Sequence, residues 1–289
     1  MAAGHPKPPR TLPYRLVIAR MPVHMTLTEQ QISTPRQGNP DTGRMILLRA
    51  SNLVKVYGTR TVVDKVSFDV GHREVIGLLG RNGAGKTTTF RMTIGMVVPD
   101  GGSVMFDGFD ITRLPMYKRA RRGMGYLSQE PSIFSRMTVE QNLHAILETT
   151  RRNKAQRREE ADKLMEQFGL TKTRKQKAAT LSGGERRKLE IARALVTNPQ
   201  LILLDEPFSG VDPIAVEDLQ REIRSLKDTL GKAILITDHN VQRTLEVCDR
   251  GIIIDNGKVL AQGSPRDLIN NPLVRQTYLG HTFRGDEFD

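Results

Sequence analysis

A glycine-rich loop constrains this chain more than any other feature of its sequence. Residues 80–87 read Gly-Arg-Asn-Gly-Ala-Gly-Lys-Thr and match the phosphate-binding pattern G-x-x-x-x-G-K-[ST] at every fixed position. The residues before the loop, 74–79, form a short apolar run typical of a buried strand, and residues 86–96 favour a helix. Because strand, loop and helix follow in the order that this pattern requires, the sequence predicts a nucleoside triphosphate site.

The residue types of the loop suit a chain of phosphates. Glycines let backbone N–H groups close around the phosphates, and the N-terminus of the following helix adds the positive end of its dipole. We expect Lys86 to reach the β- and γ-phosphates and the Thr87 hydroxyl to ligate Mg²⁺. The predicted nucleotide-binding residues of the loop are Gly80, Arg81, Asn82, Gly83, Ala84, Gly85, Lys86, Thr87 and Thr88.

A second apolar run, 201–204, ends in the two carboxylates Asp205 and Glu206. Ligands of parallel sheets bind at the carboxyl ends of the strands, so this pair lies where a nucleotide would be bound. We expect Asp205 to hold Mg²⁺ and Glu206 to polarise the attacking water. Acidic pairs at strand ends also occur by chance, so this pair gains its weight from the phosphate loop in the same chain.

The composition is that of a globular chain. Of 289 residues, 38% are hydrophobic and 26% charged, and the longest apolar runs are the length of strands, well below the roughly 18–20 residues that span a bilayer. The only cysteine, Cys248, excludes an intrachain disulfide and favours a core position in a reducing compartment. The net charge of +12 is spread along the chain, so it discriminates weakly between partners.

Residues 1–44 differ from the rest of the chain. They hold seven of the 15 prolines and six Lys or Arg against two acidic residues, which predicts a disordered basic extension. They lack the continuous apolar segment of a secretory signal. Met45, directly before the strand-like residues 46–50, is an alternative translation start.

The remaining sequence predicts an α/β fold with two additions to its core. Residues 45–112 are rich in strand formers around the phosphate loop and indicate a small antiparallel sheet. Residues of about 131–180 are charged and helical, and Thr138 with Gln141 fits a capping box. After Leu181, helices and strands alternate as in a parallel sheet.

The segment 181–185, Leu-Ser-Gly-Gly-Glu, opens a helix, and Ser182 with Glu185 also fits a capping box. A glycine-rich helix N-terminus with a serine hydroxyl is an anion site as well. Here the chain resembles the ATP-binding cassette (ABC) family, in which this signature covers the γ-phosphate bound by the other subunit. The resemblance implies a homodimer with two composite ATP sites, to which each chain contributes Ser182, Gly183, Gly184 and Glu185.

Four further stretches match motifs of this family. Tyr57 matches the aromatic residue that stacks on adenine, although a core aromatic is the alternative. Gln129 matches the glutamine that touches Mg²⁺ and water and links the core to the helical insertion. Residues 209–212 match the loop that crosses the dimer interface, although Asp212 is also a plausible helix N-cap. His239 matches the histidine that contacts the γ-phosphate.

The family resemblance implies a P-loop NTPase core with a small antiparallel β subdomain and a helical subdomain. We expect the ABC ATPase domain at 45–280, its helical subdomain at about 131–180, and a tail at 281–289. The implied cofactors are ATP and Mg²⁺. The implied catalytic residues are Glu206, His239, Gln129 and Lys86, and the implied Mg²⁺ ligands are Thr87, Gln129 and Asp205.

A finer resemblance is to the ATPase subunits that power bacterial lipopolysaccharide export. It is carried by the segments 114–121, 125–134, 181–195, 205–216, 237–241 and 274–280. It implies two integral membrane permease subunits as partners and membrane association at the cytoplasmic face of the inner membrane. The departures are the long N-terminal extension and Arg81, at a position where proline is common.

Two alternatives stay open. The first is a branched-chain amino-acid uptake ATPase, whose tail also resembles 274–280. The second is a soluble cassette ATPase acting on ribosomes or DNA through the basic runs 118–122 and 151–154; such runs are usually solvated faces, and we expect no nucleic-acid partner. For a transporter, the groove near 129–136 is the candidate permease site, with Phe134 as an apolar anchor or, alternatively, a core residue.

Overall fold

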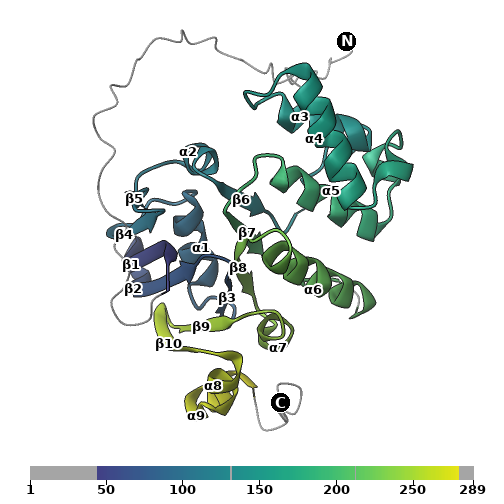
Figure 1. Ribbon diagram of the computed structural model, residues 1–289. Helices are drawn as coiled ribbons and strands as arrows, with labels where there is room; N and C mark the ends of the chain where they lie inside the picture. The colour runs from purple at the N-terminus through teal and green to yellow at the C-terminus, as the bar shows by residue number, and fades with distance from the viewer. Residues whose placement is uncertain (1–43, 131, 212, 280–289) are drawn as a thin grey trace, which may run out of the picture. The chain divides into compact units, whose positions relative to one another are not determined.

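The computed structural model describes residues 44–130, 132–211 and 213–279. Within these ranges helices and strands alternate around two sheets, as expected for an α/β fold (Figure 1). The predicted N-terminal extension, 1–44, lies outside the described residues except for Arg44, and the predicted tail, 281–289, also lies outside them. Across the described residues, no helix is both long and apolar enough to cross a membrane.

A six-stranded sheet forms the centre of the fold, with the strand order β10-β9-β3-β8-β7-β6. All neighbours are parallel except β10, which turns back on β9 at Asn256 and Gly257. Every residue of β3, β7 and β8 is buried, which explains their nearly unbroken apolar sequences. The strand bounds are β3 (Val75–Leu79), β6 (Met124–Leu127), β7 (Leu201–Asp205), β8 (Ala233–Asp238), β9 (Arg250–Asp255) and β10 (Lys258–Gly263).

The register of this sheet brings the ends of three strands together. Leu79 at the end of β3 pairs with Asp238 on β8, and Asp205 at the end of β7 pairs with Thr237. The residues that follow β3, β7 and β8 therefore gather at one edge of the sheet. That edge carries the phosphate loop and the predicted acidic pair.

The small antiparallel sheet has the order β2-β1-β4-β5 and lies beside helix α1 (Figure 1). Its strands are β1 (Ile46–Tyr57), β2 (Arg60–Gly71), β4 (Gly101–Phe106) and β5 (Phe109–Asp110). Helix α1 (Lys86–Ile94) shares an apolar core with both sheets. The expected helix 86–96 was too long, because Gly95 adopts φ 86° and closes the last turn as a left-handed C-cap.

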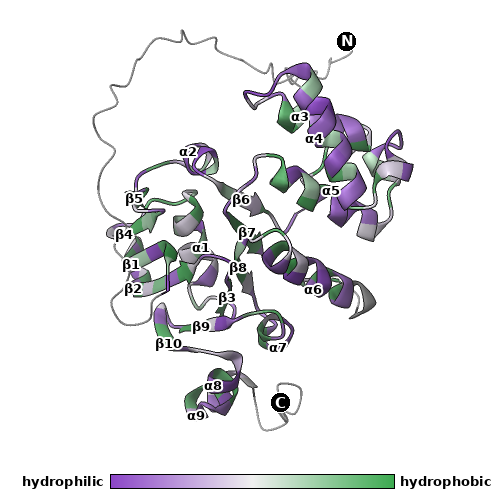
Figure 2. Ribbon diagram, viewed as in Figure 1, coloured by the Kyte–Doolittle hydropathy of each residue, from purple (hydrophilic) through white to green (hydrophobic). Residues whose placement is uncertain are grey.

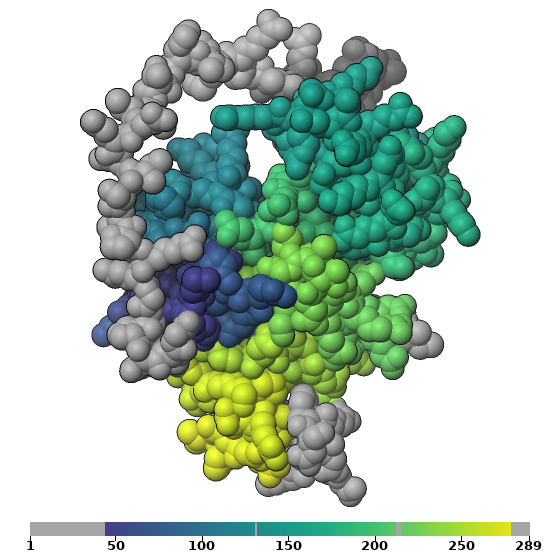
Figure 3. All heavy atoms as spheres, in the orientation of Figure 1, coloured from purple at the N-terminus to yellow at the C-terminus, as the bar shows by residue number. Residues whose placement is uncertain are grey.

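The chain from 116 to 195 contributes α2 (Met116–Arg121), α3 (Val139–Leu147), α4 (Lys154–Gln167) and α5 (Gly183–Leu195). Thr138 and Gln141 form the expected capping box at α3. Leu143, Leu164 and Leu189 bring α3, α4 and α5 into one apolar cluster. Figure 2 colours most of the α4 ribbon as hydrophilic, and α3 and α4 lie in the upper right of Figure 1. Figure 3 shows the same region with all heavy atoms.

The C-terminal part holds α6 (Pro213–Asp228), α7 (Val241–Leu245), α8 (Pro265–Asn270), α9 (Pro272–Val274) and a π-helical turn (Arg275–Leu279). Cys248 is buried, as expected, and burial raises the pKa of its thiol. Leu268, Ile269 and Val274 pack against Leu79 and Ile253. The C-terminal helices are thereby attached to β3 and β9.

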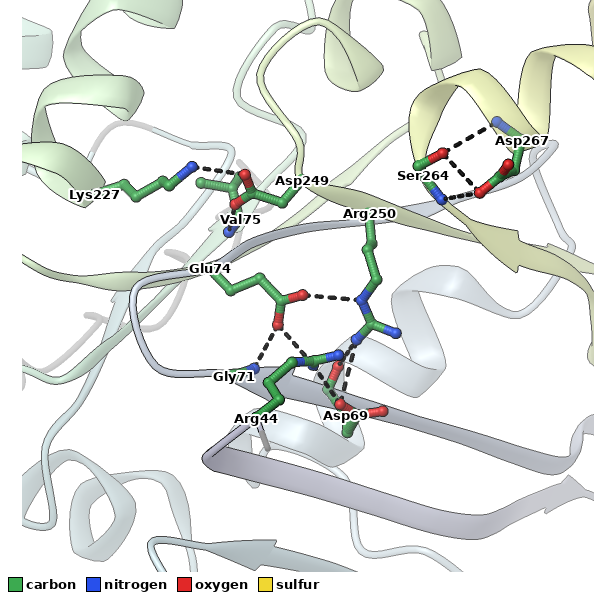
Figure 4. Close-up of polar contacts among 10 residues, drawn as sticks. All are labelled: Arg44, Asp69, Gly71, Glu74, Val75, Lys227, Asp249, Arg250, Ser264 and Asp267. Atoms are coloured by element: carbon green, nitrogen blue, oxygen red, sulfur yellow. Dashed lines mark hydrogen bonds and ion pairs between the residues drawn. The ribbon is translucent and has the colours of Figure 1, made fainter. Parts of the chain in front are cut away.

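A charged network joins the two sheets at the end of β3 opposite the phosphate loop (Figure 4). Arg250 on β9 binds Glu74 at 2.9 Å and Asp69 on β2 at 3.3 Å. Arg44 binds the same two carboxylates, with 2.7 Å between its Nη2 and Glu74 Oε2. Because each carboxylate contacts both arginines, the network holds β2 against the start of β9.

Candidate active site

The phosphate loop is the turn between β3 and α1, and its shape depends on glycine. Gly80 has φ 151°, and a Cβ there would lie 2.3 Å from the carbonyl oxygen of Ile254. Gly85 has φ 104°, and a Cβ there would lie 2.7 Å from the carbonyl oxygen of Val62. The loop can therefore pack closely against β9 and β2 only with glycine at both positions.

The N-terminus of α1 has the properties of an anion site. No side chain caps α1, whereas Ser182 caps α5 by accepting a hydrogen bond from the backbone N–H of Glu185. The first N–H groups of a helix need a partner, and a phosphate oxygen supplies one together with favourable interaction with the dipole. The loop therefore fits the triphosphate that the sequence predicts.

Lys86 lies within this loop as a buried cation. Its Nζ donates hydrogen bonds to the carbonyl oxygens of Gly80 at 2.6 Å and Arg81 at 3.0 Å. Burial lowers the pKa of Lys86, while Glu206 and Asp238 partly oppose this shift. A buried cation that is held only by neutral carbonyls is stabilised further when an anion binds beside it. Lys86 therefore also fits a bound phosphate.

Three side chains from the ends of β6, β7 and β8 converge beside the loop. Glu206 Oε2 lies 3.2 Å from Nε2 of Gln129 and 3.6 Å from Nδ1 of His239. The backbone of Glu206 has φ 45°, and its N–H donates to Thr237 O at 2.7 Å. Left-handed backbone is costly for a side chain such as glutamate and is often found at functional sites. The structure thus brings together Glu206, Gln129 and His239, as the family resemblance implies.

Asp205 has the character of a metal ligand. It is the last residue of β7 and is buried, and its Oδ2 lies 3.4 Å from the hydroxyl of Tyr126. Burial and the neighbouring Glu206 raise the pKa of Asp205. A cation beside this carboxylate would stabilise its ionised form, and oxygen ligands suit Mg²⁺. Thr87, in the first turn of α1, supplies a hydroxyl of the kind that completes such a site.

The described residues contain no group of three or more His, Cys, Asp or Glu side chains placed to hold a metal ion. Mg²⁺ in nucleotide sites is commonly bound through one or two protein oxygens together with phosphates and water. The donor set of Asp205 and Thr87 fits that kind of site.

Among the described residues, neither the signature segment nor Tyr57 forms a hydrogen bond with this cluster. Ser182 and Glu185 form the expected capping box, with 2.9 Å from the Ser182 N–H to Glu185 Oε2. A Cβ added at Gly183 or Gly184 would meet no atom within 4 Å, so both glycines face open space. Tyr57 is 51% exposed at the end of β1, so the core-aromatic alternative for Tyr57 is wrong. These surfaces have room for a ligand or another chain.

Two residues of the cluster were missed by the sequence analysis. Asp238 is fully buried, and its side chain accepts hydrogen bonds from the backbone N–H groups of Phe208 at 3.2 Å and Asn240 at 2.9 Å. Its position at the end of an apolar strand is the same signal that singled out Asp205. Tyr126, whose pKa burial raises to about 12, offered no comparable signal because its contact with Asp205 joins separate strands.

Phe134 lies at the surface of the segment before α3. It is 42% exposed, so the alternative of a core residue is wrong. The guanidinium carbon of Arg193 lies 4.6 Å from the centre of its ring. Asn142 is fully buried and bonds both backbone groups of Phe134, its Oδ1 accepting from the N–H at 2.8 Å and its Nδ2 donating to the carbonyl at 3.0 Å. Phe134 is therefore an exposed aromatic residue on a firmly held backbone.

Comparison with known proteins identifies the family. Residues 63–209 match the model of the ABC transporter family. A Haemophilus influenzae protein named lipopolysaccharide export system ATP-binding protein LptB is 52% identical over 241 residues, which are 83% of this chain and 100% of that protein. The Escherichia coli K12 protein of the same name is 51% identical over the same shares of both chains.

Other relatives carry broader names. A probable ABC transporter ATP-binding protein of Azorhizobium caulinodans is 53% identical over 82% of this chain and 84% of its own. The crystal structure of an ATP-binding cassette of an ABC transporter in its ADP conformation matches with a TM-score of 0.73 and 30% identity, covering 82% of this chain and 100% of that one. The predicted P-loop NTPase fold is confirmed, and the chain belongs to the ABC transporter family as one of its ATP-binding cassette ATPases.

Proposed function

We propose that this chain is the ATP-hydrolysing subunit of a transporter that extracts lipopolysaccharide from the inner membrane for transport to the outer membrane. The cargo is supported by the 52% identity to the H. influenzae lipopolysaccharide export protein, whose entire length this chain covers. The hydrolytic chemistry is supported by one observation above all, the convergence of Gln129 and His239 on the Glu206 carboxylate.

The proposal gives each side chain of this cluster a role. Glu206 would accept a proton from the attacking water, which Gln129 and His239 would orient from either side. Lys86 would leave its two carbonyl partners to bind the β- and γ-phosphates. Asp205, Thr87 and Gln129 would hold Mg²⁺, which when bound neutralises part of the charge on the phosphates. Phosphoryl transfer needs mainly positioning and electrostatic stabilisation, and the strand ends provide both.

The complete site would require two copies of the chain. The signature residues Ser182–Glu185 share no hydrogen bond or ion pair with the phosphate loop of the same chain among the described residues. In a homodimer, Ser182 and the open N-terminus of α5 would cover the γ-phosphate held by the partner's loop. Residues 209–211 would lie near the interface, and Asp212 falls outside the described residues.

Two permease subunits would complete the transporter and place this chain at the cytoplasmic face of the inner membrane. We assign residues 45–280 to the ATPase domain and about 131–180 to its helical subdomain. Phe134, exposed and held by Asn142, would be the apolar anchor for a permease helix. Loss of permease assembly in Phe134→Ala, with ATPase activity of the isolated subunit retained, would support this contact.

Replacement of Glu206 tests the proposal. Glu206→Gln keeps the size of the side chain but removes the base, so hydrolysis should fall by about 10²–10⁴-fold while ATP binding persists. The variant should also hold the closed dimer when ATP is present. Glu159→Gln, the same change on the exposed surface of α4, is the matched control. Normal hydrolysis by Glu206→Gln would refute the assigned role.

The partners test the cargo. Glu206→Gln protein would be purified with ATP from native membranes, and its companions identified by mass spectrometry. Two permeases of the lipopolysaccharide export type would support the proposed cargo. Permeases for amino acids would redirect the assignment to uptake, and recovery of ribosomal or nucleic-acid partners alone would refute a transport function.

A further inference from the structure

The phosphate loop is bound by a segment almost 200 residues away in sequence, the π-helical turn Arg275–Leu279. The backbone N–H of Arg81 donates to the Tyr278 hydroxyl at 3.2 Å. The Arg81 guanidinium donates to the carbonyl oxygen of Thr277, and its carbon lies 5.6 Å from the centre of the Tyr278 ring. Both the backbone and the side chain of Arg81 therefore contact the C-terminal segment.

The Tyr278 hydroxyl also binds the end of β9. It can donate its single hydrogen to Ile254 O at 2.8 Å or to Asp255 Oδ1 at 3.3 Å, while its lone pairs accept from Arg81. Ile254 O is the same carbonyl that approaches Gly80 so closely that a Cβ would not fit. The hydroxyl thus joins Arg81, the second residue of the loop, to the neighbouring strand.

Tyr278 is itself firmly placed. Its ring packs against the apolar cluster that contains Leu79, Ile253 and Val274. Burial raises the pKa of the Tyr278 hydroxyl, which is therefore protonated at neutral pH and able to donate. The contact is thus anchored in the core rather than on a free chain end.

Arg81 connects this contact to the reactive end of the loop. Its carbonyl oxygen accepts a hydrogen bond from Lys86 Nζ at 3.0 Å, while its N–H binds Tyr278. The two peptide groups of Arg81 are thereby held by the C-terminal segment and by Lys86, the proposed phosphate-binding lysine. A shift of the Arg81 backbone would move the partner of Lys86.

We propose that Tyr278 and Arg81 form a brace that positions the phosphate loop, so that the C-terminal segment sets the affinity for nucleotide. Both are positioning residues, and the inference rests on the nucleotide-binding function of the loop. A loop that is already held in its binding shape loses less conformational freedom when the ligand binds. A proline at position 81 would lack both the N–H and the guanidinium, so the brace is a property of this sequence and not of the general loop pattern.

The brace is tested by titrating the full chain with a fluorescent ATP analogue and by measuring KM and kcat for ATP. Tyr278→Phe removes only the hydroxyl and should weaken binding and raise KM about three- to tenfold, with a smaller change in kcat. Tyr117→Phe is the matched control. Tyr117 also lies beside an arginine, with Arg121 5.8 Å from its ring centre, and its hydroxyl has no hydrogen bond within the described part of the chain.

A second variant tests whether Arg81 and Tyr278 act together. Arg81→Ala keeps the N–H but removes the guanidinium, and it should also weaken binding by about two- to fivefold. In the double variant, the fold-loss of nucleotide affinity should be smaller than the product of the two single fold-losses, because both changes disrupt the same brace.

The contrary results are equally specific. Wild-type affinity in Tyr278→Phe, whether or not its melting temperature falls, would overturn the brace, as would independent losses in the double variant. If the wild-type chain failed to bind the analogue, the nucleotide-binding function itself would fail.

Discussion

Replacement of Arg119 by methionine should destabilise the protein by about 3 kcal/mol. Arg119 is 1% exposed, and its guanidinium binds only backbone carbonyls. It donates to Leu114 O at 2.8 Å, to Thr112 O at 2.9 Å, and to Met92 O and Thr93 O at 2.9 and 2.6 Å. The last two carbonyls end α1, so Arg119 caps the helix that begins in the phosphate loop.

The magnitude follows from two opposing contributions. Methionine fills a similar volume but leaves four carbonyls without this partner, at about 1 kcal/mol each. The guanidinium is costly to bury, and burial lowers the pKa of Arg119 to about 10. Removal of that cost offsets about a quarter of the loss, which leaves about 3 kcal/mol.

Denaturant unfolding of the full chain, followed by circular dichroism, measures the difference. A loss of about 3 kcal/mol corresponds to a fall in Tm of about 6–12 °C for a domain of this size. Arg121→Met, on the same helix but exposed and with its guanidinium over the Tyr117 ring, should change stability by less than about 0.5 kcal/mol. Equal effects of the two variants would refute the assignment of Arg119 as a buried helix cap.

Gly80→Ala should abolish measurable nucleotide binding and cost at least about 2 kcal/mol, because its Cβ would lie 2.3 Å from Ile254 O. Gly58 has φ 59°, and a Cβ added there would meet no atom within 4 Å, so Gly58→Ala should cost only about 1 kcal/mol of stability. If the two variants lost equal nucleotide affinity in titration and equal stability in unfolding, this reasoning would be contradicted. The Arg174 guanidinium donates a hydrogen bond to Glu140 and holds the pKa of that carboxyl below its usual range. The pair therefore stabilises the fold at pH values above the pKa of Glu140 in the unfolded chain. This stabilisation is lost as the pH falls through the pKa of Glu140 in the folded chain. Arg174→Met should therefore lower the unfolding free energy by about 0.5–1 kcal/mol at pH 7 and by much less near pH 3, and the same loss at both pH values would contradict the pairing.

Local sequence patterns predicted the elements that carry the candidate site. The phosphate loop, the apolar strand before Asp205 and the capping boxes at Thr138 and Ser182 depend on residues within a few positions of one another. Such patterns record backbone preferences and hydrogen bonds that form in any protein with the same short segment. The family follows from the order of these patterns along the chain.

The predicted helix 86–96 shows where local reasoning can err. The glycine at position 95 is a C-cap signal in the sequence, yet the prediction extended the helix to residue 96. In the structure, the Gly95 N–H donates to the carbonyls of Arg91 and Met92, and the Arg119 side chain binds the carbonyls of Met92 and Thr93. The local glycine cap therefore ends this helix, and a tertiary contact supplies partners for its last carbonyls.

The sequence by itself determined which chemical groups the protein has and that a strand, a loop and a helix would present them. Tertiary structure alone decided that Gln129 and His239 meet at Glu206, and that Tyr278 reaches Arg81 across 197 residues of chain. The physical reason is that these contacts join separate strands and segments, whose approach depends on sheet order, register and core packing. The spacing of residues within one segment therefore does not predict which distant segments come into contact.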